Sequence, residues 1–295
     1  MLKIPDFIGI GVARSATSWI YAALTEHPEI CGGKIKEIHF FDQDYNFKKG
    51  IAHYLSFFAN CPENKLKGEF TPSYFSTSKV AERIYENFPN VKLILCLRNP
   101  IEKVYSNYRY HVERKLALSI YKKLEDAINN EKKFLEKGLY YKHLNNYLEL
   151  YPREQILILL FDDIISDPLD VVSNLYSFLE VENQNFIPKS ISEKRNVSGT
   201  LITKYKIPFI SHILFKISAR LRRSKFFGDK SKGTLIRKIY FKIVRQNYKV
   251  ISDKNKDAPS IPPLQDSTRK ILYEFYKEDI KNLENLLRRD LSHWK

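Results

Sequence analysis

The 295-residue chain has little cysteine, which limits how its fold can be held together. Its three cysteines are an odd number and lack the close spacing of metal ligands. Cys96 lies within an apolar run, which is typical of a buried thiol, whereas Cys31 and Cys61 stand 30 positions apart. This usage excludes a small disulfide-rich fold, and it favours a reducing compartment over a disulfide scaffold.

The chain also lacks long hydrophobic runs. No run approaches the roughly 20 apolar residues of a membrane span, and residues 1–6 lack the apolar core of a signal peptide. Hydrophobic residues nevertheless make up 43% of the chain and aromatic residues 14%, which is enough for a core and excludes disorder. We therefore expect a soluble, cytoplasmic protein.

Acidic residues are scarce in one segment, residues 189–256, which has 19 Lys or Arg and three acidic residues. Its net charge of +16 exceeds the +15 of the whole chain, so the remainder is near neutral. Residues 207–221 and 235–248 have amphipathic helical patterns, and we predict one domain over 1–295 with a basic, mainly helical insertion at about 200–257. The charge indicates either a solvated surface or an electrostatic funnel for an acidic ligand, a polyanion or an anionic membrane surface. A membrane contact would be peripheral, through 207–248, at the inner face of the membrane. No nucleic-acid-binding module is recognisable, so we expect no nucleic-acid partner.

Near the start, an apolar run ending at Gly11 is followed by a small, hydroxyl-rich loop and a helical pattern. Such a loop directs backbone N–H groups and a positive helix end toward an anion, usually a phosphate. A Walker A motif needs Gly-Lys-Ser/Thr after four spacer residues, but counted from Gly11 those positions hold Ala16, Thr17 and Ser18. The loop's cation is Arg14. The pattern indicates a phosphate site for a ligand other than Mg-ATP.

Apolar runs and helical patterns alternate along the chain, which predicts an α/β fold with a central parallel β-sheet flanked by helices. We expect strands at 7–12, 30–32, 67–70, 91–98 and 155–161, and helices at about 18–27, 78–88, 101–115, 120–136, 138–151, 169–180 and 267–287. In such a fold the loops at the carboxyl ends of the strands meet at one edge, where ligands bind.

Three further motifs follow the loop in order: Lys36-Glu37-Ile38-His39-Phe40-Phe41, Gly68-Glu69-Phe70-Thr71-Pro72-Ser73-Tyr74, and Leu97-Arg98-Asn99-Pro100 with Ser106 beyond it. Together they resemble the sulfotransferases that use 3′-phosphoadenosine 5′-phosphosulfate (PAPS). The likeness is to bacterial members similar to heparan-sulfate-type glycan sulfotransferase domains. It implies a P-loop NTPase-like sulfotransferase fold, PAPS as sulfate donor, and no metal.

The resemblance also implies a nucleotide site. Its residues would be Arg14, Ser15, Ala16, Thr17 and Ser18 around the 5′-phosphosulfate, Arg98 and Ser106 at the 3′-phosphate, and Arg195 in a loop that closes over the nucleotide. A guanidinium fork suits a phosphate, and gripping the 3′-phosphate would reject ATP. The alternative for Arg98 is an ion pair with a surface acid.

The expected catalytic residues are Glu37, Arg14 and His39. Glu37 would act as general base toward an acceptor hydroxyl or amine, with His39 on the same segment orienting the acceptor or Glu37. The alternatives are a structural salt bridge at Glu37 and a structural histidine. The chain departs from the family pattern at Arg14, which stands for a lysine, at Ala16, which stands for a glycine, and at Phe70, which stands for a lysine.

The expected function is in-line transfer of a sulfuryl group from PAPS (EC 2.8.2.-) to a hydroxyl or amine of a glycan, glycolipid or small molecule. One alternative is a non-catalytic anion- or membrane-binding protein with a degenerate phosphosulfate loop. The other is a P-loop kinase, against which the missing Walker lysine and glycine argue.

Overall fold

The computed structural model describes residues 4–77, 79–192, 202–205, 248–251 and 261–295. The chain forms two compact units. The first comprises Met1–Asn107, Leu124–Arg195 and Pro263–Lys295, and the second comprises Tyr108–Lys123 and Asn196–Pro262. The first unit contains the whole five-stranded sheet, so it carries the fold described next.

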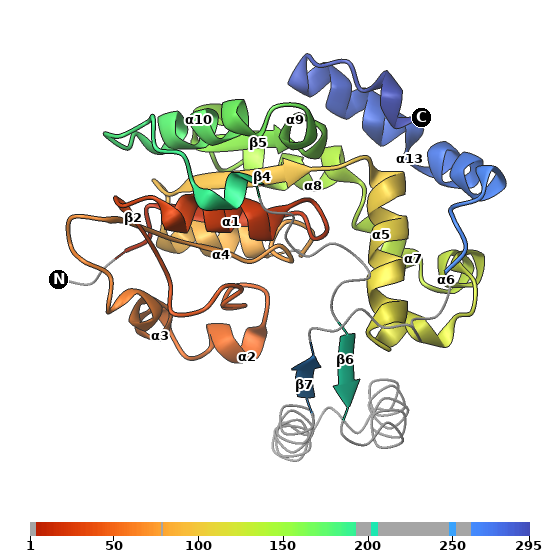
Figure 1. Ribbon diagram of the computed structural model, residues 1–295, viewed down its shortest axis with the longest axis horizontal. Coiled ribbons are helices and arrows are strands. Elements are labelled where there is room, and N and C mark those ends of the chain that lie inside the picture. Colours follow the sequence, from red (N-terminus) through yellow and green to blue (C-terminus); the bar gives the residue numbers. More distant parts are fainter. Residues whose placement is uncertain (1–3, 78, 193–201, 206–247, 252–260) are drawn as a thin grey trace. The chain divides into compact units, whose positions relative to one another are not determined.

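The centre of the first unit is a parallel sheet whose strands lie in the order β2-β3-β1-β4-β5. Figure 1 labels β2, β4 and β5 of this sheet. The strands are β1 (Phe7–Gly11), β2 (Ile30–Gly32), β3 (Leu66–Phe70), β4 (Lys92–Leu97) and β5 (Ile156–Leu160). Every residue of β1 is buried, as expected for a central strand covered on both faces. The α/β fold with a central parallel sheet is therefore confirmed.

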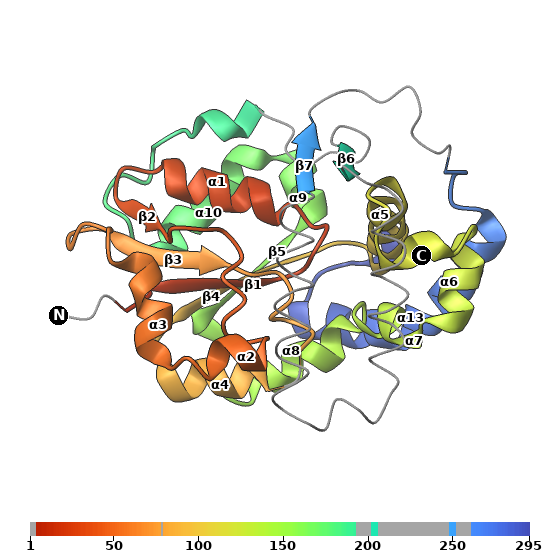
Figure 2. The same ribbon diagram turned by 90° about the horizontal axis from the view of Figure 1, so that it is seen from below.

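Helices cover both faces of this sheet (Figure 2). Helices α1 (Thr17–Glu26) and α10 (Pro168–Leu179) lie on one face, and α4 (Val80–Asn87) and α8 (Tyr140–Leu148) lie on the other. Trp19 and Ile20 of α1 pack with Leu175 of α10 in the buried core on the first face. Helix α8 contacts the long helix α13 (Asp266–Leu287), because the Asp279 carboxylate accepts hydrogen bonds from the first backbone N–H groups of α8.

Further helices and 3₁₀ turns complete the described part of the chain. They are α2 (Asp44–Phe47), α3 (Ile51–Leu55), α5 (Pro100–Glu113), α6 (Leu124–Asn130), α7 (Lys132–Glu136) and α9 (Phe161–Ser166), with 3₁₀ turns η1 (Ser56–Phe58), η2 (Ala117–Ile120), η3 (Arg153–Gln155), η4 (Lys189–Ser192) and η6 (Ser292–Trp294). The single helix predicted over 120–136 is wrong, because the chain breaks at Glu131 into α6 and α7. The Asn130 side chain donates to the Asp126 carbonyl, the kind of local bond that competes with a continuous helix.

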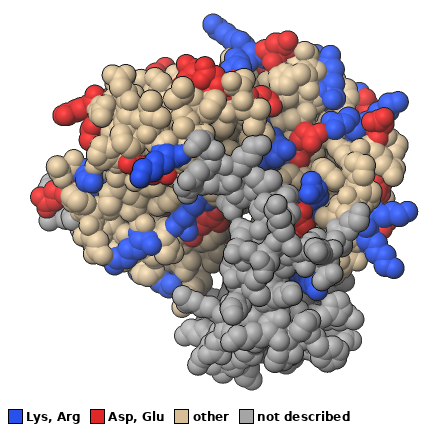
Figure 3. All heavy atoms as spheres, in the orientation of Figure 1, with Lys and Arg blue, Asp and Glu red and all other residues tan. Residues whose placement is uncertain are grey.

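In the second unit, β6 (Ile202–Tyr205) pairs antiparallel with β7 (Tyr248–Ile251). The helix predicted over 207–221, and that over 235–248 except for Tyr248, lie outside the described residues. The basic, mainly helical insertion at 200–257 within a single domain therefore stays a prediction. On the face shown in Figure 3, basic and acidic side chains of the described residues are interspersed. None of the helices in the described ranges combines the length and apolar content needed to cross a bilayer.

Two of the cysteines are paired, against the expectation from cysteine usage. Cys31 on β2 forms a disulfide with Cys61, which follows η1, and their Cα atoms lie 5.8 Å apart. The spacing of 30 residues hides this proximity, because the intervening helices α2 and α3 return the chain to β2. Cys96 is buried and unpaired, as predicted. The pair removes the cysteine argument for a reducing compartment, and the cytoplasmic location stays a prediction.

Replacing both paired cysteines by alanine should lower the free energy of unfolding by about 2–4 kcal/mol, because the cross-link restricts the unfolded chain. Chemical denaturation with and without reductant measures the difference. Reductant should bring the wild-type transition to that of the Cys31→Ala/Cys61→Ala variant and leave the variant unchanged. A wild-type transition that ignores reductant would show that the cysteines are not paired.

Candidate active site

The four sequence motifs meet at the carboxyl edge of the sheet because they follow neighbouring parallel strands. The loop after β1 lies between the segments that follow β3 and β4, and the segment after β2 lies beyond that of β3. This order places Arg14 beside Arg98 and places His39 beside Thr71 and Ser73. The site therefore has two halves, one on the β1–β4 side and one on the β2–β3 side.

The loop after β1 offers donors to an anion. The Ser15 side chain is fully buried, and its Oγ atom has no hydrogen-bond partner among the described residues. At the start of α1, no backbone carbonyl in the described ranges accepts from the N–H groups of Ala16, Thr17 or Ser18. Helix N-termini leave such donors free, and they bind phosphate and sulfate groups. The loop therefore presents donors of the kind that an anion needs, and its role as a phosphate site stays a prediction.

Two arginines and a serine are brought together beside this loop. Arg14 donates from Nε to Ser106 Oγ at 3.2 Å, and Arg98 donates from Nη1 to the Arg14 carbonyl oxygen at 3.1 Å. The Arg98 guanidinium also lies over the Phe161 ring, 4.5 Å from its centre, and burial lowers its pKa. No carboxylate in the described part of the chain forms an ion pair with Arg98, which argues against the surface salt bridge. Its charge remains for an anionic ligand.

The residues at two of the departures from the family pattern, Arg14 and Ala16, have left-handed backbone conformations. Their φ angles are 74° and 54°, in the region that glycine adopts most readily, so Ala16 keeps a backbone that suits the family glycine. The third departure, Phe70, supplies packing to the core. Its ring lies over Gly9, where an added Cβ atom would be 2.1 Å from Phe70 Cδ2. The position of the family lysine thus contributes no charge to this site.

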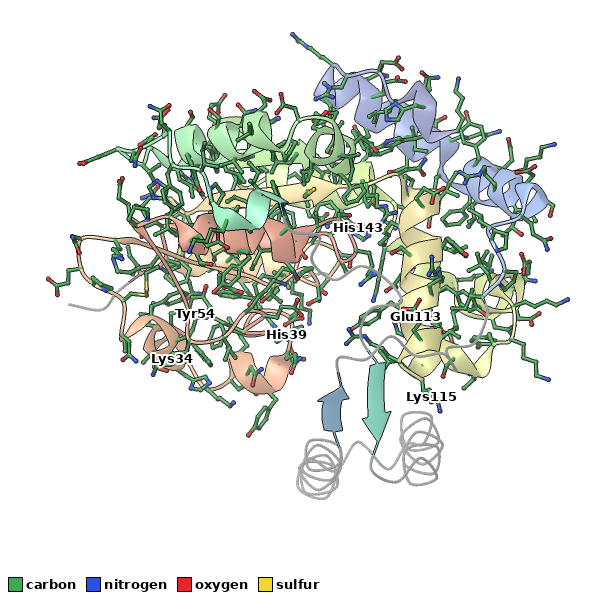
Figure 4. All side chains as sticks on the ribbon, viewed as in Figure 1. Lys34, His39, Tyr54, Glu113, Lys115 and His143 are labelled. Carbon is green, nitrogen blue, oxygen red and sulfur yellow. A yellow bond between two sulfur atoms is a disulfide. The ribbon has the colours of Figure 1, made fainter. Side chains whose placement is uncertain are left out.

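The second half of the site is a chain of two carboxylates and an imidazole. Lys36 Nζ lies 2.7 Å from Glu37 Oε1, and Glu37 Oε2 lies 3.8 Å from His39 Nε2. The other imidazole nitrogen, Nδ1, lies 2.9 Å from Asp42 Oδ2, which also accepts from Ser73 Oγ at 2.6 Å. Figure 4 labels His39 in this half of the site. The Glu37 side chain is 43% exposed, so the outer end of the chain is accessible to an acceptor.

The inner end of this chain controls the charge on His39. The hydrogen bond to Asp42 raises the pKa of His39 against the opposing effect of burial. Burial alone would raise the pKa of Asp42, but hydrogen bonds from His39 and Ser73 outweigh it and hold that pKa below its usual range. The arrangement favours an imidazolium–carboxylate pair next to Glu37.

Asp42 and Ser73 were not among the predicted site residues, although both lie in or beside the quoted motifs. Asp42 follows the buried Phe40 and Phe41 directly, and a carboxylate after two buried aromatic residues was the available signal. Of the predicted residues, Arg14, Arg98 and Ser106 lie together, as do Glu37 and His39. Arg195 lies outside the described residues and stays a prediction. Within the described ranges, no group of three or more His, Cys, Asp or Glu side chains is arranged to hold a metal ion.

Comparison with known proteins identifies the family. Residues 5–206 match the family described as "Sulfotransferase domain". The chain belongs to this family, and the resemblance inferred from the motifs is confirmed.

Curated relatives are similar over part of their length. The chain is 31% identical over 188 residues to the mouse heparan sulfate glucosamine 3-O-sulfotransferase 5, covering 61% of this chain and 54% of that protein. It is 25% identical over 300 residues to the membrane-associated sulfotransferase kil1 of Dictyostelium discoideum, covering 70% and 64%. The chain thus spans about half the length of the heparan sulfate enzymes that it matches.

A solved structure supports the fold over the whole chain. The sulfotransferase from Alicyclobacillus acidocaldarius aligns over 99% of both chains with a TM-score of 0.68 and 21% sequence identity. The central sheet and its flanking helices are therefore the sulfotransferase fold, as predicted.

Replacing Asp42 by asparagine should lower the pKa of His39, because the variant removes the carboxylate that stabilises the imidazolium. NMR titration of the His39 ring protons measures this shift. In the wild type, the pair stabilises the fold below the ordinary histidine pKa, and this contribution is lost as the pH rises through the elevated value. Asp44→Asn is the matched control, because Asp44 is exposed and pairs with Arg83. An unchanged His39 titration in Asp42→Asn would contradict the assignment.

Proposed function

We propose that this protein transfers a sulfuryl group from PAPS to a hydroxyl or amine of an acceptor, with a glycan or glycolipid as the acceptor class. The observation that carries the proposal is the meeting of an anion-binding half and an acid–base half at one sheet edge. Membership in the sulfotransferase family and the names of the heparan sulfate relatives support it.

The residues present fit the two anionic ends of the donor. Ser15 to Ser18 would hold the 5′-phosphosulfate through backbone N–H groups and hydroxyls, and Arg98 with Ser106 would hold the 3′-phosphate. Arg14 donates a hydrogen bond to Ser106, and its carbonyl oxygen accepts one from Arg98. Arg14 therefore connects the loop at the 5′-phosphosulfate position with the two residues at the 3′-phosphate position. When bound, PAPS supplies an activated sulfuryl group on a phosphate.

Glu37 serves as the general base. It accepts the proton of the acceptor hydroxyl or amine as that atom bonds to sulfur and the sulfur–oxygen bond to the phosphate breaks. Arg14 stabilises the negative charge that develops on the departing oxygen, a purely electrostatic role because arginine does not readily give up a proton. His39, held by Asp42, places a positive charge beside Glu37 and orients its carboxylate.

The acceptor would approach from the exposed side of Glu37. Lys36 forms an ion pair with Glu37 on that side, and its positive charge would attract a sulfated or carboxylated glycan. A membrane contact through 207–248 would suit a glycolipid acceptor, but those residues are described only from Tyr248, and this contact stays a prediction.

Replacing Glu37 by glutamine should reduce sulfate transfer by at least about 100-fold, because an amide cannot accept the proton. Transfer of labelled sulfate from PAPS onto polysaccharide and lipid fractions measures the rate, and calorimetry measures binding of the product nucleotide, 3′-phosphoadenosine 5′-phosphate. Nucleotide binding should be retained. Glu86→Gln, at an exposed position of α4, is the control and should transfer normally. Full transfer by Glu37→Gln would show that another group is the base.

The product nucleotide should bind without Mg²⁺ and more tightly than Mg-ATP, because Arg98 and Ser106 address a 3′-phosphate that ATP lacks. Arg98→Ala should weaken its binding about 10- to 100-fold, the usual range for losing a charged hydrogen-bonding partner. Arg153→Ala, an exposed arginine just before β5, should bind normally. Stronger thermal protection by Mg-ATP would favour a kinase. Nucleotide binding without transfer to any acceptor would favour a non-catalytic anion-binding protein.

A further inference from the structure

Glu69 is a fully buried carboxylate directly behind the acid–base half of the site. It lies on the central region of the sheet, in β3, opposite Ile8 of β1. Its Oε2 atom accepts a hydrogen bond of 2.6 Å from Thr71 Oγ1, and its Oε1 atom has no partner among the described residues. The mechanism described above does not use this group, and its placement inside a sheet is costly.

Two hydroxyl groups hold the segment that bears the proposed base, and one of them is hydrogen-bonded to Glu69. Thr71 Oγ1 donates a hydrogen bond to Glu69 and lies 3.5 Å from the His39 backbone nitrogen. The Tyr74 hydroxyl accepts from the Phe40 backbone N–H at 3.0 Å. Burial, and then the nearby Glu69 carboxylate, hold the pKa of Tyr74 well above its usual range.

The segment that these hydroxyls hold needs external support. Glu37 and His39 both have positive φ angles, 65° and 54°, which non-glycine residues rarely adopt. Two such residues in one short segment persist only when the surroundings fix them. The His39 backbone N–H faces the Thr71 hydroxyl, and the Phe40 backbone N–H donates to the Tyr74 hydroxyl. Both hydroxyls belong to the segment that follows β3. Without these contacts, the Glu37 and His39 side chains would lose their relative position.

We propose that Glu69 is a positioning residue for the transfer reaction: its hydrogen bond with Thr71 directs the Thr71 oxygen toward the His39 backbone N–H and thereby helps to fix Glu37 and His39. This inference rests on the proposed function, in which Glu37 is the base. A hydroxyl has one hydrogen to donate. Because Thr71 donates that hydrogen in its hydrogen bond to Glu69, the lone pairs of its oxygen remain to accept from the His39 backbone N–H. Glu69 therefore determines the direction in which that hydroxyl can act.

This role separates activity from stability. Burial raises the pKa of Glu69 to about 7, so the folded protein disfavours its charge and loses stability as the pH rises from the ordinary carboxyl range through 7. The titratable groups coupled to it are Tyr21 of α1, Tyr54 of α3, and Tyr74, His39 and Asp42. Tyr54, labelled in Figure 4, has a buried hydroxyl without a partner among the residues described. A neutral amide of the same shape removes the buried charge.

The test is the pair Glu69→Leu and Thr71→Val, with Glu69→Gln, which keeps an acceptor oxygen, and Thr71→Ser, which keeps the hydroxyl, as the variants that retain the hydrogen bond. For Glu69→Leu we expect kcat to fall about 10- to 100-fold, the cost of a small misplacement, with KM for PAPS unchanged. Hydrogen exchange at the amides of 39 and 40 should accelerate. The free energy of unfolding at pH 8 should not fall, because the buried charge is gone. Thr71→Val should reproduce the loss of kcat, and Thr71→Ser should recover it.

Thr268→Val is the matched control. Thr268 lies at the start of α13, is buried, and donates a hydrogen bond from its hydroxyl to the Glu125 carboxylate of α6. This variant should change neither kcat nor the exchange of 39 and 40. If folded Glu69→Leu has wild-type kcat and wild-type exchange at these amides, the proposal is overturned. If the wild type transfers sulfate to no acceptor, the proposed function fails, whereas the exchange measurement still decides whether Glu69 holds the segment.

Discussion

Parallel hydrogen bonding of β2, β3, β1 and β4 is the constraint on which the site depends. It brings four chain segments to one edge in a fixed order, with β1 between β3 and β4. In the loop after β1, the Arg14 carbonyl accepts a hydrogen bond from Arg98. In the segment after β2, His39 contacts Thr71 and Ser73, which follow β3. A different strand order would separate these pairs. The buried, apolar strands thus determine which polar residues can cooperate.

The two halves of the site differ in whether their charged side chains are paired with opposite charges. The anion half uses backbone donors of a helix start and a guanidinium without a carboxylate partner in the described chain, so its charge is available to a ligand. The acid–base half does the opposite, since His39 and Asp42 are already paired. Pairing fixes the imidazole and leaves Glu37 as the accessible member.

Particular residues show which parts of the fold and of the candidate site could be predicted from the sequence. Strands β1, β4 and β5 were predictable because each is a short apolar run, whereas β2 and β3 gave weaker signals. The motifs indicated Arg14, Glu37 and Arg98 as site residues, and the sheet brings them to one edge. The disulfide was not predictable, because the return of Cys61 to β2 depends on two short helices that carry no strong pattern. Asp42, Ser73 and Glu69 were missed for a related reason: their roles come from contacts between β2 and β3 segments that lie about 30 residues apart. Local pattern cannot report such contacts.

The buried Glu69 is best understood as a cost retained for function. A buried carboxylate in the sheet lowers stability at neutral pH, and a leucine would carry no charge there. The carboxylate, however, supplies the acceptor oxygen that Thr71 needs if the Thr71 oxygen is to face His39. The left-handed backbone at Glu37 and His39 is a second cost at the same place. Both unfavourable features belong to one hydrogen-bonded group of residues beside Glu37, the most accessible carboxylate of the site. This arrangement argues that the stability lost there maintains the geometry of the proposed base.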